Sequence, residues 1–370
     1  MKENEKISVV GIGKLGICFA LNAAYKGFDV IGVDINQEYV DKLNNKQIES
    51  TEPRVKQFLM GVDTFRATTN LEEAIKHSDN IFLVVATPTD LTYGYDHSQV
   101  DGIVDKLKEF GQQEQTKHLI ICCTVLPGYS NKVYDTLWKY NWQVSYNPEF
   151  IAQGQIIRDQ LNPDIILIGE SGVFVGDWLE KFYSRFCDNS PNFHRMSRLS
   201  AEITKISLNC FLTTKIAYAN MIGDICIAAG AETDKVLGAI GDDSRIGPKY
   251  LKYGYGYGGP CFPRDNRTLA KYADTLGYDA KISKASDESN NQHLEFQTNE
   301  FTKNLCENTP VTLTTVTYKE GTTIIEESQQ LKFAEMLANK GCEVTIEEHQ
   351  EVIRQVKELY GNLFIYREKK

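Results

Sequence analysis

The sequence predicts an α/β protein whose N-terminal domain, residues 1–198, contains a parallel sheet. Up to about residue 150, short apolar runs rich in β-branched residues alternate with amphipathic segments, which is typical of βαβ units. A single long apolar helical pattern then predicts a central helical domain at residues 199–300. After Pro310, strand and helix patterns alternate once more, which predicts a shortened C-terminal α/β domain at residues 301–370.

The N-terminal strands are predicted from four apolar runs, which are Ile7–Val10, Val30–Asp34, Ile81–Val85 and Leu119–Thr124. Between them, the segments Leu15–Lys26 and Glu38–Asn44 have helical spacing. Because parallel strands need crossover connections, which are usually helices, this alternation indicates a parallel sheet flanked by helices.

Residues 199–230 form one helical pattern that is apolar nearly all round, so we expect a helix that is buried on several sides. Ser200 is its candidate N-cap, and Gly230 is its candidate C-terminal stop. This helix could pack against a second subunit, which predicts a homodimer. Residues 246–263 are rich in glycine, proline and tyrosine and predict a loop, and the polar residues 284–300 could begin as a linker.

The C-terminal segment offers a strand at Val311–Thr317, a helix at Glu327–Asn339 and a strand at Glu343–Ile346. A helix at 347–360 and a strand at 363–366 complete its pattern. This alternation of short strands and helices predicts a small α/β domain.

The composition is that of a globular protein, with 42% hydrophobic and 24% charged residues. The net charge of -10 argues against nucleic acid or an anionic membrane as a partner. The N-terminus lacks a signal-peptide layout, and no apolar run reaches the roughly 18 residues of a membrane span. Nine cysteines without CxxC pairs argue against a disulfide framework or a metal site. We therefore expect a cytoplasmic protein without a metal.

A glycine-rich turn follows the first predicted strand and opens a helical pattern. Its glycines are Gly11, Gly13 and Gly16, and Asp34 ends the next strand. In this context the pattern is typical of a Rossmann-like domain that binds a dinucleotide pyrophosphate at a helix N-terminus. Asp34 would accept a hydrogen bond from a ribose 2′-hydroxyl and repel a 2′-phosphate, which favours NAD over NADP. The alternative is a glycine turn in an α/β domain that binds no nucleotide.

Cys261 lies in the loop GYGGPCFPRD, whose glycines could leave room for a ligand to reach the thiol. A thiol near a helix N-terminus and a cation such as Arg264 loses its proton more easily. A lone cysteine is more often a buried small hydrophobe, and this interpretation applies to the other eight. Lys205 and Asn209 project from one face of the long helix, where a lysine is costly unless it is paired or used. The alternative for Lys205 is an extended side chain with its ammonium in solvent.

Seven segments of the chain, spread over about residues 6–330, match those of a known family in the same order. They are VVGIGKLG, VATPT, CTVLPG, YNPEFIAQG, AEITKISLNCF, RIGPKYLKYGYGYGGPCFPRD and the weaker YKEGTTIIEES. The chain thereby resembles the UDP-glucose and UDP-sugar 6-dehydrogenases. The resemblance implies an NAD-dependent four-electron oxidation of a nucleotide-sugar C6 alcohol to the carboxylate. UDP-glucose, converted to UDP-glucuronate, is the first expectation.

By this resemblance the catalytic residues are Thr124, Glu149, Lys205, Asn209, Cys261 and Asp265. Cys261 is implied as the nucleophile that forms a thiohemiacetal and then a thioester. Lys205, assisted by Asn209, would stabilise oxyanions, and Asp265 would orient Cys261 and Lys205. Glu149 is the expected general base for hydrolysis, with Thr124 assisting proton or water transfer.

The resemblance also implies two sets of binding residues. The NAD contacts would be Gly11, Gly13, Lys14, Leu15, Gly16, Asp34, Thr87 and Thr124. The substrate contacts would be Phe150, Ile151, Ala152, Gln153, Lys205, Asn209, Arg245, Tyr250, Lys252, Gly258 and Lys319. In the family, Arg245 usually reaches across the dimer. The NPEF loop resembles UDP-glucose enzymes more than N-acetylmannosamine enzymes.

The chain departs from the family pattern at three places. Gln153 replaces a carboxylate, so the role of base falls to Glu149. Glu326 replaces an arginine that contacts NAD, and the C-terminal domain is short. These departures leave three alternatives open. They are a dehydrogenase for another nucleotide sugar such as a UDP-N-acetylhexosamine, a non-catalytic relative that binds NAD or a nucleotide sugar, and a two-electron dehydrogenase of the β-hydroxyacid type, which needs no cysteine.

Overall fold

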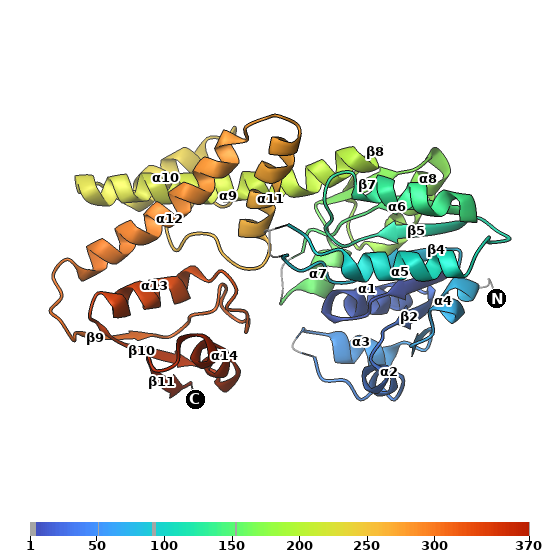
Figure 1. Ribbon diagram of the computed structural model, residues 1–370, viewed down its shortest axis with the longest axis horizontal. Helices are drawn as coiled ribbons and strands as arrows, with labels where there is room; N and C mark the ends of the chain where they lie inside the picture. The colour runs from blue at the N-terminus through green and yellow to red at the C-terminus, as the bar shows by residue number, and fades with distance from the viewer. Residues whose placement is uncertain (1–4, 51, 91–93, 152–153, 370) are drawn as a thin grey trace. The chain divides into compact units, whose positions relative to one another are not determined.

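The computed structural model describes residues 5–50, 52–90, 94–151 and 154–369. The described chain forms two compact units (Figure 1). The first comprises the described residues up to Asp90 and Tyr95–Lys205, and the second comprises Gly94 and the described residues from Ile206 onward.

The first unit contains an eight-stranded sheet of described residues in the order β3-β2-β1-β4-β5-β6-β7-β8. Its strands are β1 (Lys6–Val10), β2 (Asp29–Val33), β3 (Phe65–Thr68), β4 (Asn80–Leu83), β5 (Lys117–Ile121), β6 (Trp142–Tyr146), β7 (Ile165–Glu170) and β8 (Asn192–Ser197). All neighbouring pairs are parallel except β6 and β7, which are antiparallel. The predicted parallel sheet is therefore confirmed. Its order reverses at β1, the point at which such sheets bind ligands at their carboxyl ends.

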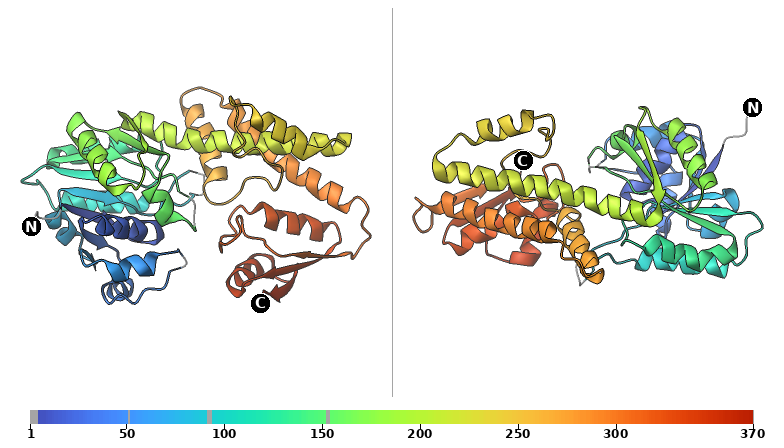
Figure 2. Two further views of the ribbon diagram at one scale, coloured as in Figure 1. Left: turned by 180° about the vertical axis from the view of Figure 1, so that it is seen from behind. Right: turned by 90° about the horizontal axis from the view of Figure 1, so that it is seen from above.

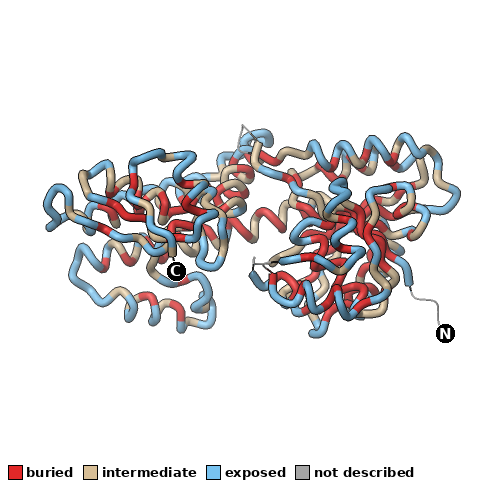
Figure 3. Tube along the Cα trace, turned by 90° about the horizontal axis from the view of Figure 1, so that it is seen from below, coloured by how far each residue is buried: buried red, intermediate tan, exposed pale blue. Residues whose placement is uncertain are grey.

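Helices cover both faces of this sheet (Figures 1 and 3). They are α1 (Lys14–Tyr25), α2 (Gln37–Asn44), α3 (Val55–Gly61), α4 (Leu71–His77), α5 (Ser98–Glu109), α6 (Tyr129–Leu137), the 3-10 turn η1 (Trp138–Tyr140), α7 (Ile156–Leu161) and α8 (Val173–Phe186). Strand β4 shows how the two cores form, because Phe82 packs into one and its neighbours Ile81 and Leu83 pack into the other. A sheet buried on both faces needs continuous apolar strands, as the sequence has.

The long predicted helix is α9 (Arg198–Ala229), one continuous helix (Figure 2). The prediction of Ser200 as its N-cap is wrong. The helix begins earlier, and the Ser197 hydroxyl accepts the Ser200 backbone N–H at 3.2 Å. The AExxK glutamate, Glu202, is buried and accepts the backbone N–H groups of Gly128 and Ser130 at 2.6 and 2.7 Å. Glu202 thereby caps the start of α6 and anchors the first turns of α9 to the first unit.

The second unit continues with α10 (Thr233–Asp242), α11 (Phe262–Thr275) and α12 (Lys281–Thr302). The linker suggested at residues 284–300 is wrong, because this stretch lies within α12. Its polar side chains include Asn290 and His293, which are buried and hydrogen-bonded to the backbone of the loop before α11. Within the described residues, none of the helices, α9 included, has the length and apolar character needed to cross a bilayer.

The C-terminal part of the second unit is a small parallel sheet of described residues in the order β11-β10-β9. Its elements are β9 (Pro310–Leu313), α13 (Gln329–Asn339), β10 (Glu343–Glu348), α14 (Gln350–Tyr360) and β11 (Ile365–Glu368). The predicted pattern of strands and helices is confirmed, but the first strand ends at Leu313 and not at Thr317. Side chains from both helices and all three strands enclose its core.

Candidate active site

The three glycines after β1 have different surroundings. Gly11 has a φ of 89°, and a Cβ there would lie 2.6 Å from the backbone oxygen of Val84. A Cβ on Gly16 would lie 1.9 Å from the backbone oxygen of Gly11. By contrast, apart from Gly13 itself and its two chain neighbours, no described residue has a heavy atom within 4 Å of the place of a Cβ on Gly13. The chain's own packing therefore demands two of the glycines, and Gly13 leaves open space at the start of α1, where a pyrophosphate can approach the backbone amides.

Asp34 follows β2, and its Oδ1 accepts the backbone N–H of Asn36 at 3.0 Å, which fixes the carboxylate at the end of the strand. The next residue, Ile35, is 90% exposed. An exposed apolar side chain beside Asp34, the predicted ribose-binding acid, suits contact with an adenine face, and the sequence analysis missed it. These features fit NAD at this loop. At the ends of β4 and β5, the Thr87 hydroxyl donates to the backbone oxygen of Thr124 at 2.8 Å, so these two predicted NAD contacts lie together.

Glu149 follows β6 and has a buried carboxylate. Its Oε1 accepts a hydrogen bond from Gln160 Nε2 at 2.8 Å, and Lys205 Nζ donates to its backbone oxygen at 2.7 Å. Burial raises the pKa of Glu149 to about 7, although the Gln160 hydrogen bond and the charge of Lys205 act to lower it. A carboxylate with a pKa near the operating pH is suited to general-base catalysis.

Lys205 is only 8% exposed, so it is not a lysine extended into solvent. Its Nζ lies 4.4 Å from the centre of the Phe150 ring, a cation–π distance. The Asn147 side chain fixes the loop after β6, because it donates to the backbone oxygen of Leu167 and accepts the Tyr183 hydroxyl. The NPEF segment therefore holds both the predicted base, Glu149, and an aromatic partner of Lys205, the Phe150 ring.

Glu52 is a second buried acid of the first unit that the sequence analysis missed. Its carboxylate accepts the backbone N–H groups of Gly154 and Ile156 at 2.7 and 3.4 Å, and Lys14 lies 3.5 Å away. Glu52 thus links the phosphate loop to the predicted substrate loop. No local pattern marks it, because its partners are distant in sequence. Leu15 is exposed and Phe150 and Ile151 are partly buried, whereas Ala152 and Gln153 lie outside the described residues.

In the second unit, Cys261 is an exposed thiol at the N-cap position of α11. A Cβ on Gly258 would lie 2.4 Å from the backbone oxygen of Glu327, and one on Gly259 would lie 2.4 Å from the Tyr318 ring. The lack of side chains at these two glycines therefore allows other parts of the chain to pack closely against the loop. The sequence analysis had instead expected the glycines to leave space for a ligand. The expectation that the other eight cysteines are buried holds for six of them, but it is wrong for Cys306, which is exposed, and for Cys342, which is half-buried. The six buried ones are Cys18, Cys122, Cys123, Cys187, Cys210 and Cys226.

Asn209 and Asp265 form a buried pair, with Asn209 Nδ2 donating to Asp265 Oδ2 at 2.7 Å. Asp265 Oδ1 lies 3.4 Å from Arg264 Nε, and the Asp265 backbone N–H donates to the backbone oxygen of Cys261 at 2.8 Å. The carboxylate therefore orients the Asn209 amide and neutralises Arg264 at the start of α11. The structure brings together three of the predicted residues of this unit.

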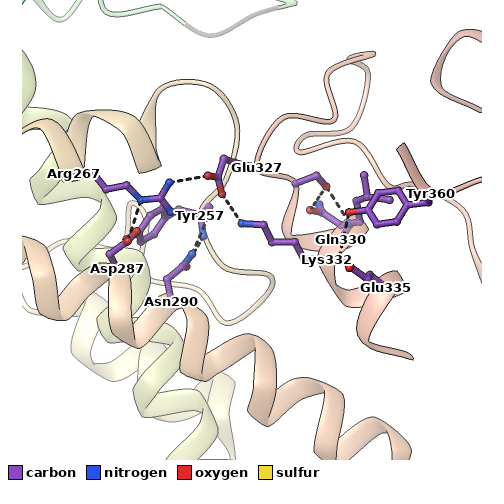
Figure 4. A network of polar contacts seen from close by, with 11 residues as sticks. Tyr257, Arg267, Asp287, Asn290, Glu327, Gln330, Lys332, Glu335 and Tyr360 are labelled. Carbon is purple, nitrogen blue, oxygen red and sulfur yellow. Dashed lines mark hydrogen bonds and ion pairs between the residues drawn. The ribbon is translucent and has the colours of Figure 1, made fainter. Parts of the chain in front are cut away.

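The loop before Cys261 is clamped by side chains that the sequence analysis missed. Asn290 accepts the Tyr257 backbone N–H at 2.9 Å and donates to its oxygen at 3.0 Å (Figure 4). Asn220 pairs in the same way with Gly254 N–H and Tyr255 O, at 3.1 and 3.4 Å. His293, which contacts Asp224 at 2.9 Å, lies 2.7 Å from the Gly254 oxygen. Buried amides on the long helices thus fix the backbone that leads to the thiol.

The remaining predicted substrate residues are basic or aromatic and accessible. Arg245 is exposed and pairs with Asp243 at 2.7 Å. Lys252 and Lys319 are exposed, and Tyr250 is exposed with a φ of 63°. Accessible cations of this kind can bind a diphosphate.

Glu326 is exposed, whereas its neighbour Glu327 is part of an ion-pair network (Figure 4). Glu327 accepts Arg267 Nη1 at 2.7 Å and also pairs with Lys332, and Arg267 Nε lies 3.1 Å from Asp287. This network ties the segment before α13 to α11 and α12 within the second unit.

The first unit is a doubly wound sheet with this glycine loop and Asp34, and the second unit has an exposed thiol at the start of a helix. These features define the class of dinucleotide-dependent oxidoreductases that contain an accessible cysteine. Residues 5–187 match the NAD binding domain of the UDP-glucose/GDP-mannose dehydrogenase family, and residues 199–292 match its central domain. The chain belongs to this family. It is therefore an NAD-dependent nucleotide-sugar dehydrogenase, as the motifs predicted.

Two similar curated proteins have different substrates in their names. The UDP-glucose 6-dehydrogenase of Pseudomonas aeruginosa is 29% identical over 92% of this chain and 78% of its own length. The GDP-mannose 6-dehydrogenase of Pseudomonas savastanoi pv. phaseolicola is 30% identical over 92% and 80%. The UDP-glucose dehydrogenase structure from Pyrobaculum islandicum has a TM-score of 0.88 and 25% identity over 98% of this chain and 86% of that chain. The family is thus established, and the sugar is a separate question.

The glycine loop yields a prediction about cofactor binding. Gly13→Ala should change the free energy of unfolding by less than about 1 kcal/mol, because its Cβ meets open space and its φ is -62°. The methyl group should still weaken NAD binding by about tenfold, or 1.4 kcal/mol. Thermal unfolding with and without NAD, together with an NAD titration, measures both effects.

Gly16→Ala is the matched comparison, because its Cβ would clash with the chain itself and should cost about 3 kcal/mol of stability. A Gly13→Ala variant that binds NAD as tightly as the wild type would contradict the assignment of the open space to the cofactor.

Proposed function

We propose that this chain oxidises the C6 alcohol of UDP-glucose to the carboxylate, through a thioester on Cys261. The observation that supports this most directly is the exposed Cys261 thiol at the start of α11, followed by the buried Asn209–Asp265 pair. A primary alcohol needs two oxidations to reach a carboxylate, and a thiol nucleophile makes the second possible. The NPEF sequence of the substrate loop favours UDP-glucose among the sugars that the family oxidises.

The proposed reaction comprises two oxidations and one hydrolysis. NAD supplies the acceptor of a hydride in each of two oxidations. The C6 alcohol loses a hydride and a proton to become an aldehyde, and the Cys261 sulfur then adds to the aldehyde carbon. The resulting thiohemiacetal loses a hydride and a proton to become a thioester. Water attacks the thioester, the carbon–sulfur bond breaks, and the carboxylate and the thiol are released.

Each remaining residue has a proposed role that its contacts support. The Lys205 ammonium, held by the backbone oxygen of Glu149 at 2.7 Å, would stabilise the oxygen anions of the alcohol and of the tetrahedral adducts. The Asn209 amide, oriented by Asp265, would donate to the same oxygens. Glu149 would remove a proton from the water that attacks the thioester, with Thr124 assisting.

The proposed division of the chain follows these roles. Residues 1–198 would hold NAD, residues 199–300 would provide Cys261 and dimer contacts, and residues 301–370 would help bind the nucleotide sugar. The dimer proposal rests on apolar side chains of α9 that are exposed in the single chain, namely Phe211, Tyr218, Met221 and Ile225. The proposed site of action is the cytoplasm, where we expect both reactants.

A substrate panel tests the proposal. Purified protein with NAD is offered UDP-glucose, GDP-mannose and UDP-N-acetylmannosamine, and NADH formation is followed by absorbance. UDP-glucose should give the highest kcat/KM, with two NADH per carboxylate. A higher kcat/KM for another sugar would replace UDP-glucose as the substrate. No turnover with any sugar, together with thermal stabilisation by NAD, would identify a non-catalytic binding protein.

Replacing the nucleophile tests the thioester. Cys261→Ser should reduce carboxylate formation by about 10³-fold or more, because a serine hydroxyl is a far weaker nucleophile than a thiolate. Product analysis by mass spectrometry measures this loss. Cys306→Ser is the control, because Cys306 is also exposed but has no proposed role. Normal carboxylate output from Cys261→Ser would instead indicate a mechanism without a covalent intermediate.

The pH dependence of turnover tests the proposed base. Glu149 must be ionised to accept a proton, and burial raises its pKa to about 7. Where hydrolysis limits the rate, kcat should therefore rise with pH through about pH 7 and level off above it. Steady-state rates between about pH 5.5 and 8.5 measure this rise, which is the acid limb of the profile. In the Glu149→Gln variant, kcat should be low and should no longer show the acid limb. A flat wild-type profile would remove Glu149 from this role.

A further inference from the structure

A chain of buried amides leads from the first helix to Glu149. Asn22, on α1, is fully buried, and its Nδ2 donates to Gln160 Oε1 at 2.9 Å. Gln160, on α7, is 5% exposed, and its Nε2 donates to Glu149 Oε1 at 2.8 Å. Hydrogen bonds thereby connect α1 to α7 and α7 to the Glu149 carboxylate after β6.

The orientation of the Gln160 amide is determined by its neighbours. Its Oε1 faces a donor, Asn22 Nδ2, and its Nε2 faces two acceptors, Glu149 Oε1 and the backbone oxygen of Leu15 at 3.5 Å. The flipped amide would oppose oxygen to oxygen at both acceptors and nitrogen to nitrogen at Asn22. Asn22 therefore keeps the Gln160 N–H group directed at the carboxylate.

The second carboxylate oxygen has a different environment. Glu149 Oε2 is buried, and no group of the described residues hydrogen-bonds to it. Asn22 Oδ1 is also buried without a partner among the described residues. A buried acceptor without a partner destabilises the fold, and an apolar side chain at position 22 would avoid that cost for Asn22 Oδ1. Stability alone therefore does not explain the amide chain.

We propose that Gln160, oriented by Asn22, is a positioning residue that binds Oε1 of Glu149 and so directs Oε2 to accept the proton from the attacking water. This inference rests on the role of Glu149 in the proposed function. Gln160 itself touches no reacting atom, and it acts through the geometry and the charge of Glu149.

Other titratable groups also face the Glu149 carboxylate. They are Lys205 on α9, Cys18 on α1, Cys122 after β5, Tyr183 on α8 and, lining the same pocket, Asp159 on α7. Burial raises the pKa of Cys18 to about 12 and the pKa values of Cys122 and Tyr183 well above their usual range. These thiols and the phenol stay neutral near pH 7, so a titration of this cluster near pH 7 reports Glu149.

The sign of the Gln160 effect follows from its hydrogen bond. Donation from Nε2 favours the ionised carboxylate and lowers the pKa of Glu149 against the effect of burial. Gln160→Met keeps a similar volume and removes the donor. The acid limb of kcat should therefore move up by about one pH unit, kcat at pH 7 should fall, and KM should change little.

The control is Arg158→Met, an exposed position on the same short helix, which should leave the pH profile unchanged. Asn22→Leu is a second variant, which should move the acid limb in the same direction by allowing the Gln160 amide to turn. If Gln160→Met does not fold, the pH profile of Asn22→Leu tests the inference in its place. An acid limb at the wild-type pH in the folded variants would overturn the inference.

A measurement without substrate separates this inference from the proposed function. The Glu149 carboxyl carbon, labelled with ¹³C and assigned by its loss in Glu149→Gln, is titrated by NMR. Gln160→Met should raise its midpoint by about one pH unit. Inactive wild-type protein with this shift would reject the function and retain the hydrogen-bond effect on Glu149. Active protein with equal midpoints and equal acid limbs would retain the function and reject Gln160 as a positioning residue.

Discussion

The burial of the Glu149 carboxylate is the constraint on which the site of the first unit depends. An isolated carboxylate in an apolar interior is too costly to ionise, so it needs a nearby cation and hydrogen-bond donors. Lys205 supplies the cation and Gln160 the donor, and the balance leaves the pKa of Glu149 at about 7. The same balance explains why a lysine stands on an otherwise apolar helix, since the Glu149 backbone oxygen and the Phe150 ring satisfy its ammonium.

Backbone contacts set a second constraint, which is most visible at the glycines. Gly11 and Gly16 allow a tight turn between β1 and α1. Of these three loop glycines, only Gly13 leaves space that the chain does not fill. Gly258 and Gly259 instead allow the loop before Cys261 to approach Glu327 and Tyr318. Hydrogen bonds from Asn220, Asn290 and His293 then fix the backbone of this loop, which leads to the Cys261 thiol.

Periodicity predicted much of the fold, because burial repeats along each element. Helix α9 and the four predicted strands, which are β1, β2, β4 and β5, lie within a few residues of their predicted places, whereas β3, β6, β7 and β8 were not predicted. The prediction failed at α12, whose buried polar residues bind backbone groups of a distant loop and so look like solvent-facing residues. The family motifs predicted Asn209, Cys261 and Asp265 as site residues, but no motif pointed to Gln160 or Glu52. Their roles come from partners that only the folded chain brings near.

Three glutamates of the first unit have buried carboxylates, and they differ in how completely the carboxylate oxygens are hydrogen-bonded. Glu202 places its two oxygens on the N–H groups of Gly128 and Ser130, and Glu52 places its two on Gly154 and Ile156. In both, a backbone N–H group binds each carboxylate oxygen, which suits a structural cap. Glu149 has one oxygen bound by Gln160 and one buried without a partner among the described residues. Of these three acids, it is the one with a carboxylate oxygen left to accept a proton, and it lies within the NPEF segment of the family motif. Both observations support its proposed role as the base.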